Sequence, residues 1–269
     1  MLKGELMYNY YFFDLDGTLV EKGSNIISEN NYKILQKIKS RGHKIIINTG
    51  RDLKRAFAIK NLDKIADYVI ASLGSIISDN KGNILKIYPI SKEKCFEVLK
   101  ELKYKAVIGY GTKDGEKIIN SGKIQLYYDN CKAENRDIGK IVDVYEFLND
   151  AELGRVLNFY FYVNNPKTFY CNINDLNLFS SYNNGIDVTY KNIDKGYPIE
   201  EYFSNHKEYY YFYAIGDGEN DIPMFNICDT SISFVDSNIK AREKAKIISP
   251  IASNNDGITY IFENILKEW

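Results

Sequence analysis

The sequence predicts an α/β fold in which a core built on a parallel β-sheet is interrupted by an inserted α+β domain. Short apolar strands alternate with helices in residues 1–83 and again in residues 191–269. This alternation is typical of a parallel sheet covered by helices. Residues 84–190 lack the regular order. We therefore expect residues 1–83 and 191–269 to form one core domain, and residues 84–190 to form the insertion, which is reasonable for a chain of 269 residues.

The first strand is expected in the aromatic run Tyr8–Phe13. A nearly continuous apolar run of this length is typical of a strand that is covered on both faces. A helix is expected over Ser28–Arg41, where apolar residues recur at helical spacing and Gly42 is placed to end the helix. The first half continues with a β-branched strand at Lys44–Ile47, a helix around Leu53–Leu62 and a strand at Tyr68–Ala71.

The same rhythm returns in the second half of the chain. Its expected elements are helix Tyr197–Phe203, strand Tyr209–Ile215, helix Ile222–Asn226, strand Ser231–Phe234, helix Ile239–Ala245 and a closing helix from Thr259. In the insertion we expect helix Lys92–Leu102, strands at Ala106–Tyr110 and Ile124–Tyr128, helix Ile138–Leu148 and a strand in the alternating run Val156–Val163. The mixture of helices and strands in the insertion predicts an α+β unit.

The composition excludes several classes of partner. Basic and acidic residues number 35 and 36, so the chain has no overall field that attracts nucleic acid or an anionic membrane. No apolar run approaches the roughly 18 residues that a membrane helix needs. The cysteines form no CxxC pair, and we expect them to be buried thiols in the cytoplasm. They are Cys95, Cys131, Cys171 and Cys228.

Two acidic turns follow two of the expected strands. Asp14 and Asp16 come directly after the first strand, and Asp217 and Asp221 follow a strand roughly 200 residues later. Converging carboxylates repel each other unless a cation lies between them, and Mg2+ prefers such hard oxygen ligands. Either turn alone is most simply a solvated acidic loop. Because ligands bind at the carboxyl ends of strands in an open α/β sheet, the two turns together predict one metal site.

Two further strand ends carry groups suited to phosphate. Thr49 and Gly50 supply a hydroxyl and backbone N–H groups, and Lys195 supplies a cation at the start of a helix. A nucleophile, metal ligands, donors and a cation are the groups that phosphoryl transfer requires. For Arg51, which follows Gly50, contact with phosphate and a structural ion pair remain equally good interpretations.

At these positions the chain resembles the haloacid dehalogenase superfamily, and within it the Cof-type sugar phosphatases with a type C2 (C2B-like) cap. The first motif is Asp14-Leu15-Asp16-Gly17-Thr18-Leu19 and the second is Asn48-Thr49-Gly50-Arg51. The third is Asp194-Lys195-Gly196, and the fourth runs from Gly216 to Phe225 as GDGENDIPMF. Asn255-Asp256-Gly257-Ile258 resembles another recurring element of that branch. Four motifs in order are a strong signal, although where relatives commonly have Ala-Asn-Gly this chain has Ser72-Leu73-Gly74.

The resemblance implies a Mg2+-dependent phosphatase that acts on a small phosphorylated metabolite, with a Rossmann-like core and the insertion as a cap. It implies that Asp14 is the nucleophile that becomes phosphorylated, and that Asp16 is the general acid and base, with a carbonyl that also contacts the metal. Asp217 is implied as a metal ligand, and Asp221 either as a ligand or as a partner of the ligands. The implied phosphate-binding residues are Thr49, Gly50, Lys195 and Asn220.

Two other functions stay open at this point. One is phosphotransfer to an acceptor other than water, as in a mutase. The other is a sensor of phosphorylated ligands that keeps the fold without catalysis. Retention of both Asp14 and Asp16 argues against the sensor, because binding alone needs no nucleophile.

Overall fold

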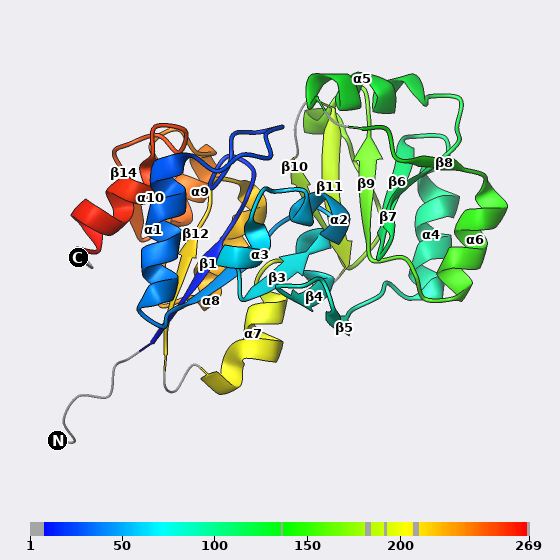
Figure 1. Ribbon diagram of the computed structural model, residues 1–269. Helices are drawn as coiled ribbons and strands as arrows, with labels where there is room; N and C mark the ends of the chain where they lie inside the picture. The colour runs from blue at the N-terminus through cyan, green and yellow to red at the C-terminus, as the bar shows by residue number, and fades with distance from the viewer. Residues whose placement is uncertain (1–7, 136, 181–183, 191–192, 207–209, 268–269) are drawn as a thin grey trace.

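The computed structural model describes residues 8–135, 137–180, 184–190, 193–206 and 210–267 (Figure 1). Within these residues the strands form a sheet of eight strands and a sheet of six. The larger sheet contains strands from both ends of the chain, and the smaller sheet contains the strands between them (Figure 1). Two separate sheets confirm the expected α/β core and α+β insertion.

The eight-stranded sheet has the order β14-β13-β12-β1-β2-β3-β4-β5. In this order, neighbouring strands from β14 through β3 pair in parallel. Strands β4 and β5 then extend the sheet beyond β3 in antiparallel fashion. The expected parallel core is therefore present, with an antiparallel extension that the sequence analysis did not anticipate. The strands are β1 Asn9–Phe13, β2 Lys44–Asn48, β3 Tyr68–Ala71, β4 Ile76–Asp79, β5 Ile84–Ile87, β12 Tyr211–Ile215, β13 Thr230–Phe234 and β14 Ile247–Ser249. Tyr209, expected to begin β12, lies outside the described residues.

Alternate side chains of β1 pack into two different hydrophobic layers. Tyr11 and Phe13 belong to a cluster that includes apolar residues of helices α1 (Glu29–Ser40) and α10 (Gly257–Tyr260). Tyr10 and Phe12 belong to the opposite cluster, with residues of helices α7 (Tyr197–Phe203) and α8 (Ile222–Ile227). Because successive side chains of a strand point to opposite faces, the aromatic residues 10–13 fill both layers, and the strand lies inside the sheet between β12 and β2.

The helices around this sheet agree with most of the expected ones. The expected helix at Leu53–Leu62 is instead two short helices: the first ends at Phe57, and Asn61, directly before the second, adopts a left-handed conformation with φ of 61° that a continuous helix does not allow. Besides α1 and α10, the helices are α2 Leu53–Phe57, α3 Leu62–Ile65, α7 Tyr197–Phe203, α8 Ile222–Ile227 and α9 Ile239–Lys244. A π-helical turn at Ile261–Ile265 follows α10. Single 3-10 turns lie at Ser72–Gly74, Ser204–His206 and Glu219–Asp221.

The six-stranded sheet has the order β10-β11-β9-β6-β7-β8. Helices α4 and α6 contribute to the cluster that covers one face, and α5 packs on the other face together with Val107 and Ile118. Most of that second face is left open toward the larger sheet (Figure 1). The elements are β6 Val107–Thr112, β7 Gly115–Ile119, β8 Lys140–Val142, β9 Asn158–Tyr162, β10 Leu176–Ser180, β11 Gly185–Tyr190, α4 Lys92–Leu102, α5 Gln125–Ala133 and α6 Val144–Glu152, with a 3-10 turn at Pro166–Thr168.

Two expectations for the insertion were wrong. Ile124–Tyr128 is not a strand but the start of α5, in which Tyr127 and Cys131 are both buried at a helical spacing of four. Ile138–Leu148 is not one helix, because Lys140–Val142 pairs with β7 and α6 begins only after Asp143. The Asp143 carboxylate accepts a hydrogen bond from the Glu146 N–H at 2.8 Å, which caps the helix at that point.

The first boundary expected between core and insertion is also misplaced by one strand. Residues 84–87 form β5, which hydrogen-bonds to β4 in the larger sheet. The core sheet therefore continues past residue 83. At the other boundary, residues 191 and 192 lie outside the described part of the chain. Among the described residues, no helix is long and apolar enough to cross a membrane.

Candidate active site

The site lies where the central parallel strands end. Phe13 of β1 pairs with Ile215 of β12 on one side and with Ile47 of β2 on the other. The backbone N–H of Asp14 continues this pattern and donates to the Ile215 carbonyl at 3.0 Å. The residues that follow these strands are therefore adjacent, although Asp14 and Asp217 are distant in sequence.

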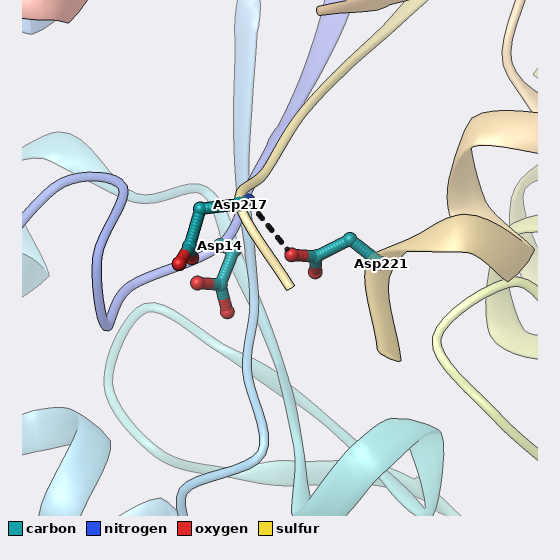
Figure 2. Close-up of side chains that lie close together, drawn as sticks. All are labelled: Asp14, Asp217 and Asp221. Atoms are coloured by element: carbon teal, nitrogen blue, oxygen red, sulfur yellow. Dashed lines mark hydrogen bonds between the residues drawn. The ribbon is translucent and has the colours of Figure 1, made fainter. Parts of the chain in front are cut away.

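Three carboxylates meet at this edge of the sheet. One oxygen from each of Asp14, Asp217 and Asp221 lies within 4.8 Å of the others, and all three residues are buried (Figure 2). Three close carboxylate oxygens are a donor set that suits a hard divalent cation such as Mg2+. The residues present therefore fit the expected ion. The carboxylate of Asp16 is not part of this group.

Lys195 supplies a fixed positive charge beside the carboxylates. Its Nζ lies 2.5 Å from Asp14 Oδ1 and 2.6 Å from Asp221 Oδ1, and its side chain is 1% exposed. Burial alone lowers the pKa of a lysine, but the two carboxylates outweigh it, and the pKa of Lys195 is raised. The Asn48 amide donates to the Lys195 carbonyl at 2.7 Å, which fixes the backbone at the start of α7.

Two of the acidic groups resist ionisation. Burial raises the pKa of Asp14 well above its usual range, and the Lys195 ammonium only partly opposes this. Burial also raises the pKa of Asp217, with Lys22 as the main opposing charge. Asp221 adds to the upward shift of both pKa values, and Asp217 adds to that of Asp14, because like charges at short range disfavour the ionised form. A cation that binds among these carboxylates would therefore relieve their mutual repulsion.

Asp221 organises the turn that carries Asp217. Its Oδ2 accepts hydrogen bonds from the N–H groups of Asp217 at 3.0 Å and Gly218 at 2.8 Å, while Oδ1 binds Lys195. The first of these bonds is visible in Figure 2. A Cβ at Gly216 would lie 2.5 Å from Asp221 Cγ, so only glycine lets the backbone come this close. Both oxygens of Asp221 are thus engaged by the protein.

Asp16 is held by a different partner. The Arg51 guanidinium binds both of its carboxylate oxygens and also donates to the Ser24 carbonyl at 2.8 Å. A second guanidinium nitrogen donates to Asn25 Oδ1 at 2.7 Å. The structure therefore contains the ion pair, with Asp16, that was one of the two interpretations of Arg51. Sequence reasoning offered no partner for it, because Asp16 lies 35 residues away.

The expected phosphate-binding residues are not equally accessible. Gly50 and Asn220 line the cleft in front of the carboxylates. Thr49 is fully buried, and its hydroxyl oxygen accepts a hydrogen bond from the Arg51 N–H at 3.1 Å. Leu73 packs directly behind Gly50, because a Cβ at Gly50 would lie 3.2 Å from Leu73 Cδ2.

Leu73 belongs to a strained turn. Ser72 and Leu73 both adopt left-handed conformations, with φ of 51° and 56°, and both are buried. Such conformations cost about 1–2 kcal/mol for residues with a Cβ. The Ser72 hydroxyl is buried with no hydrogen-bond partner among the described residues. This turn is where the sequence departs from the pattern Ala-Asn-Gly.

A cleft of about 990 Å³ separates the carboxylates from the open face of the smaller sheet. That face contributes Glu116, Tyr160 and Tyr162 to the lining. The Tyr160 hydroxyl lies 3.4 Å from the Gly50 carbonyl oxygen, to which it donates, so the two sheets touch beside the site. Tyr162 donates to Glu116 at 2.6 Å. Sequence reasoning missed these residues, because their positions depend on how the sheets face each other.

Comparisons with known proteins agree with this arrangement. A family model described as a haloacid dehalogenase-like hydrolase matches residues 11–262. A protein of Mycoplasma pneumoniae described as "Putative phosphatase" is 23% identical over 283 residues, which cover 95% of this chain and 96% of the relative.

Solved structures share the fold over nearly the whole chain. The HAD subclass IIB sugar phosphatase BT4131 is similar with a TM-score of 0.78 at 19% identity, covering 96% of this chain and 98% of that one. BT1666 from Bacteroides thetaiotaomicron, one of the phosphatases of the haloalkanoate superfamily, gives a TM-score of 0.78 at 20% identity and covers 98% of this chain and 97% of its own. The family match spans both halves of the larger sheet and confirms the resemblance drawn from the four motifs. The chain belongs to the haloacid dehalogenase-like hydrolases.

Proposed function

We propose that this hydrolase is a Mg2+-dependent phosphatase that releases phosphate from small phosphorylated metabolites through a phosphorylated Asp14. The observation that carries the proposal is the position of Asp14 at the end of the central strand, 2.5 Å from the Lys195 ammonium and grouped with two more carboxylates. With Mg2+ bound beside it in addition to Lys195, the Asp14 carboxylate would keep its charge while it approaches a phosphate anion. A binding protein has no need of such a group.

The reaction divides into two displacements. In the first, a carboxylate oxygen of Asp14 forms a bond to phosphorus, and the bond between phosphorus and the substrate oxygen breaks. Asp16 donates the proton that the leaving oxygen requires. In the second, Asp16 removes a proton from water, the water oxygen bonds to phosphorus, and the bond to Asp14 breaks. Phosphate leaves and both carboxylates return to their starting forms.

The remaining residues have supporting roles in this scheme. Asp14, Asp217 and the Asp16 backbone carbonyl would hold Mg2+, which when bound offsets the negative charge of the carboxylates and the phosphate. We assign Asp221 to holding Lys195 and the Asp217 turn, since both of its oxygens are already engaged. Gly50 and Asn220 would donate to phosphate oxygens from the cleft wall, and Thr49 would support that loop.

Sugar phosphates are the substrate class that we propose. The similar structure BT4131 is described as a sugar phosphatase. The cleft wall opposite Asp14 presents tyrosines and a carboxylate, and such groups bind the apolar faces and hydroxyl groups of sugars.

The cysteines are all free thiols, and three of the four are buried, which supports a reducing compartment such as the cytoplasm.

The test is phosphate release from a panel of hexose and pentose phosphates, with Mg2+ and with EDTA. We expect turnover that requires the metal and that Asp14→Asn abolishes. After an acid quench, mass spectrometry of the wild type should find phosphate on the peptide that contains Asp14. Turnover that survives in Asp14→Asn would exclude the covalent route. Tight binding of sugar phosphates without any turnover in the wild type would favour a sensor.

A further inference from the structure

Lys22 is a second cation at the carboxylate cluster, and the proposed reaction does not use it. Its Nζ lies 3.1 Å from Asp217 Oδ2, and its side chain is 60% exposed. It lines the same cleft as Asp14 and Asp16. An ammonium group at a carboxylate that is expected to bind a metal ion supplies one positive charge there, but neither the double charge nor the coordination of Mg2+.

The loop that carries Lys22 is built to bring it there. Gly17 has φ of 86°, and a Cβ at this position would lie 2.7 Å from Lys22 Cε and 2.5 Å from Asp217 Oδ2. The missing side chain of Gly17 therefore opens the path by which Lys22 reaches Asp217. Backbone hydrogen bonds fix the base of the loop, with Gly17 N–H donating to the Val20 carbonyl at 2.8 Å.

Lys22 and Lys195 differ in how firmly they are held. Lys195 is buried between two carboxylates, so removing its charge would leave both without their cation. Lys22 contacts one carboxylate and is mostly in solvent, where an ion pair contributes little net free energy. Lys22 can therefore leave Asp217 at small cost, whereas Lys195 cannot.

We propose that Lys22 is an exchangeable cation that competes with the metal ion for Asp217 and that, once displaced, binds phosphate in the cleft. In the metal-free protein it partly neutralises a cluster with more carboxylates than ammonium groups. When a metal ion takes Asp217, the Lys22 ammonium is free to turn toward an anion in the cleft that it lines. Metal binding and phosphate binding are then coupled through one side chain. This inference rests on the proposed function only in placing phosphate in this cleft.

The first experiment titrates the full-length, metal-free protein with Mg2+ by calorimetry, without substrate. Lys22→Met should lower the Kd for Mg2+ by about two- to fivefold, which is the range expected for loss of an exposed competing ion pair. Lys54→Met is the matched control, because Lys54 lines the same cleft and is exposed, and no ion pair joins it to the carboxylates within the described chain. It should change the Kd for Mg2+ much less than Lys22→Met does. Equal effects of the two variants would overturn direct competition.

The second experiment measures binding of inorganic phosphate with and without saturating Mg2+. In the wild type, Mg2+ should tighten phosphate binding, and in Lys22→Met this gain should fall about two- to fivefold. Lys22→Arg should keep the gain. A gain that is the same in wild type and Lys22→Met would overturn the proposal. Both measurements are made without turnover, so their outcome is distinguishable from failure of the proposed phosphatase activity.

Discussion

The Arg51 guanidinium holds the Asp16 carboxylate at both oxygens, with Nη2 2.6 Å from Oδ1 and Nε 2.7 Å from Oδ2. Arg51 is 5% exposed and is fixed by Ser24 and Asn25 as well. Two-point pairing of this kind gives a fixed orientation as well as charge. It fixes in one orientation the Asp16 side chain, which lines the cleft and lies outside the carboxylate cluster.

The first prediction concerns this pair. Arg51→Lys keeps the positive charge but cannot bind both oxygens, so Asp16 loses its fixed orientation. We expect kcat for a sugar phosphate to fall about tenfold, with little change in KM, since proton transfer is sensitive to geometry. Asp16→Asn alone should lower kcat by roughly 10²–10⁴-fold.

The double variant separates positioning from other roles of Arg51. In an Asp16→Asn background, Arg51→Lys should have almost no further effect, because the residue that it positions no longer transfers a proton. Effects that multiply fully would show that Arg51 acts on phosphate directly instead.

A second prediction concerns the buried charge of Lys195. Lys195→Met leaves Asp14 and Asp221 without their shared cation, and removing one partner of a buried ionic group costs about 3–5 kcal/mol. Urea denaturation of the metal-free protein should show this loss in the free energy of unfolding. Because the carboxylates then have more unbalanced charge, saturating Mg2+ should recover more stability in the variant than in the wild type. A variant as stable as the wild type without metal would contradict the assignment.

A third prediction uses two glycines that share a conformation but not a location. Gly17 and Gly82 have φ of 86° and 82°, so alanine is strained by a similar amount at either position. Only at Gly17 would the new Cβ meet the Asp217 carboxylate, at 2.5 Å, whereas at Gly82 its nearest neighbour is Phe57 at 3.6 Å. In urea titrations Gly82→Ala should lose about 1–2 kcal/mol of stability from backbone strain, and Gly17→Ala should lose more, because the clash with Asp217 adds to the same strain.

Metal affinity distinguishes the two glycines. Both variants are made in a Lys22→Met background, because a Cβ at Gly17 would also lie 2.7 Å from Lys22 Cε. In that background Gly17→Ala should raise the Kd for Mg2+, measured by calorimetry, because the new methyl group displaces the Asp217 carboxylate, and Gly82→Ala should leave the Kd unchanged. If Gly17→Ala left the Kd unchanged too, Asp217 would not be a ligand in its present position.

The fourth prediction concerns stability at alkaline pH. Burial raises the pKa of the Cys95 thiol from 9.0 to about 12. Above pH 9 the unfolded chain loses this proton while the folded chain keeps it, so the free energy of unfolding falls as pH rises toward 12. Below pH 9 the group contributes no slope. One such group contributes at most about 1.4 kcal/mol per pH unit.

The measurement is the free energy of unfolding in urea at intervals across pH 8–10. Cys95→Ala should have a shallower decline above pH 9 than the wild type, on top of a constant loss from its smaller side chain. The upper limit of pH 10 keeps buried tyrosines such as Tyr10, whose pKa is raised from 10.0 to about 12, from dominating the slope. Parallel curves for the two proteins would show that the Cys95 thiol ionises equally in both states.

Much of the core was predictable from the sequence. The run that became β1 is apolar at every position except Asn9, and in the structure its aromatic side chains pack on both faces of the sheet, as the sequence predicted. The insertion was harder to predict. The segment that begins α5 is a short apolar run, and a run of that length fits a strand or a buried helix equally well. Its helical form depends on Tyr127 packing against Tyr162 of β9.

What the sequence determined by itself is the set of chemical groups and the strand ends that carry them. The sequence could identify Asp14, Asp217 and Lys195, because each lies at the end or the start of a strand or helix that the local pattern of apolar residues predicts. Only the tertiary structure decided which groups touch: that Arg51 holds Asp16, that Lys22 reaches Asp217, and that Asp221 binds Lys195 and the Asp217 turn. The alternation of apolar and polar residues that predicts a strand or helix can be read within a few residues. The contacts at the site depend instead on how loops distant in sequence pack together. Those neighbours fix the charge and the orientation of each side chain.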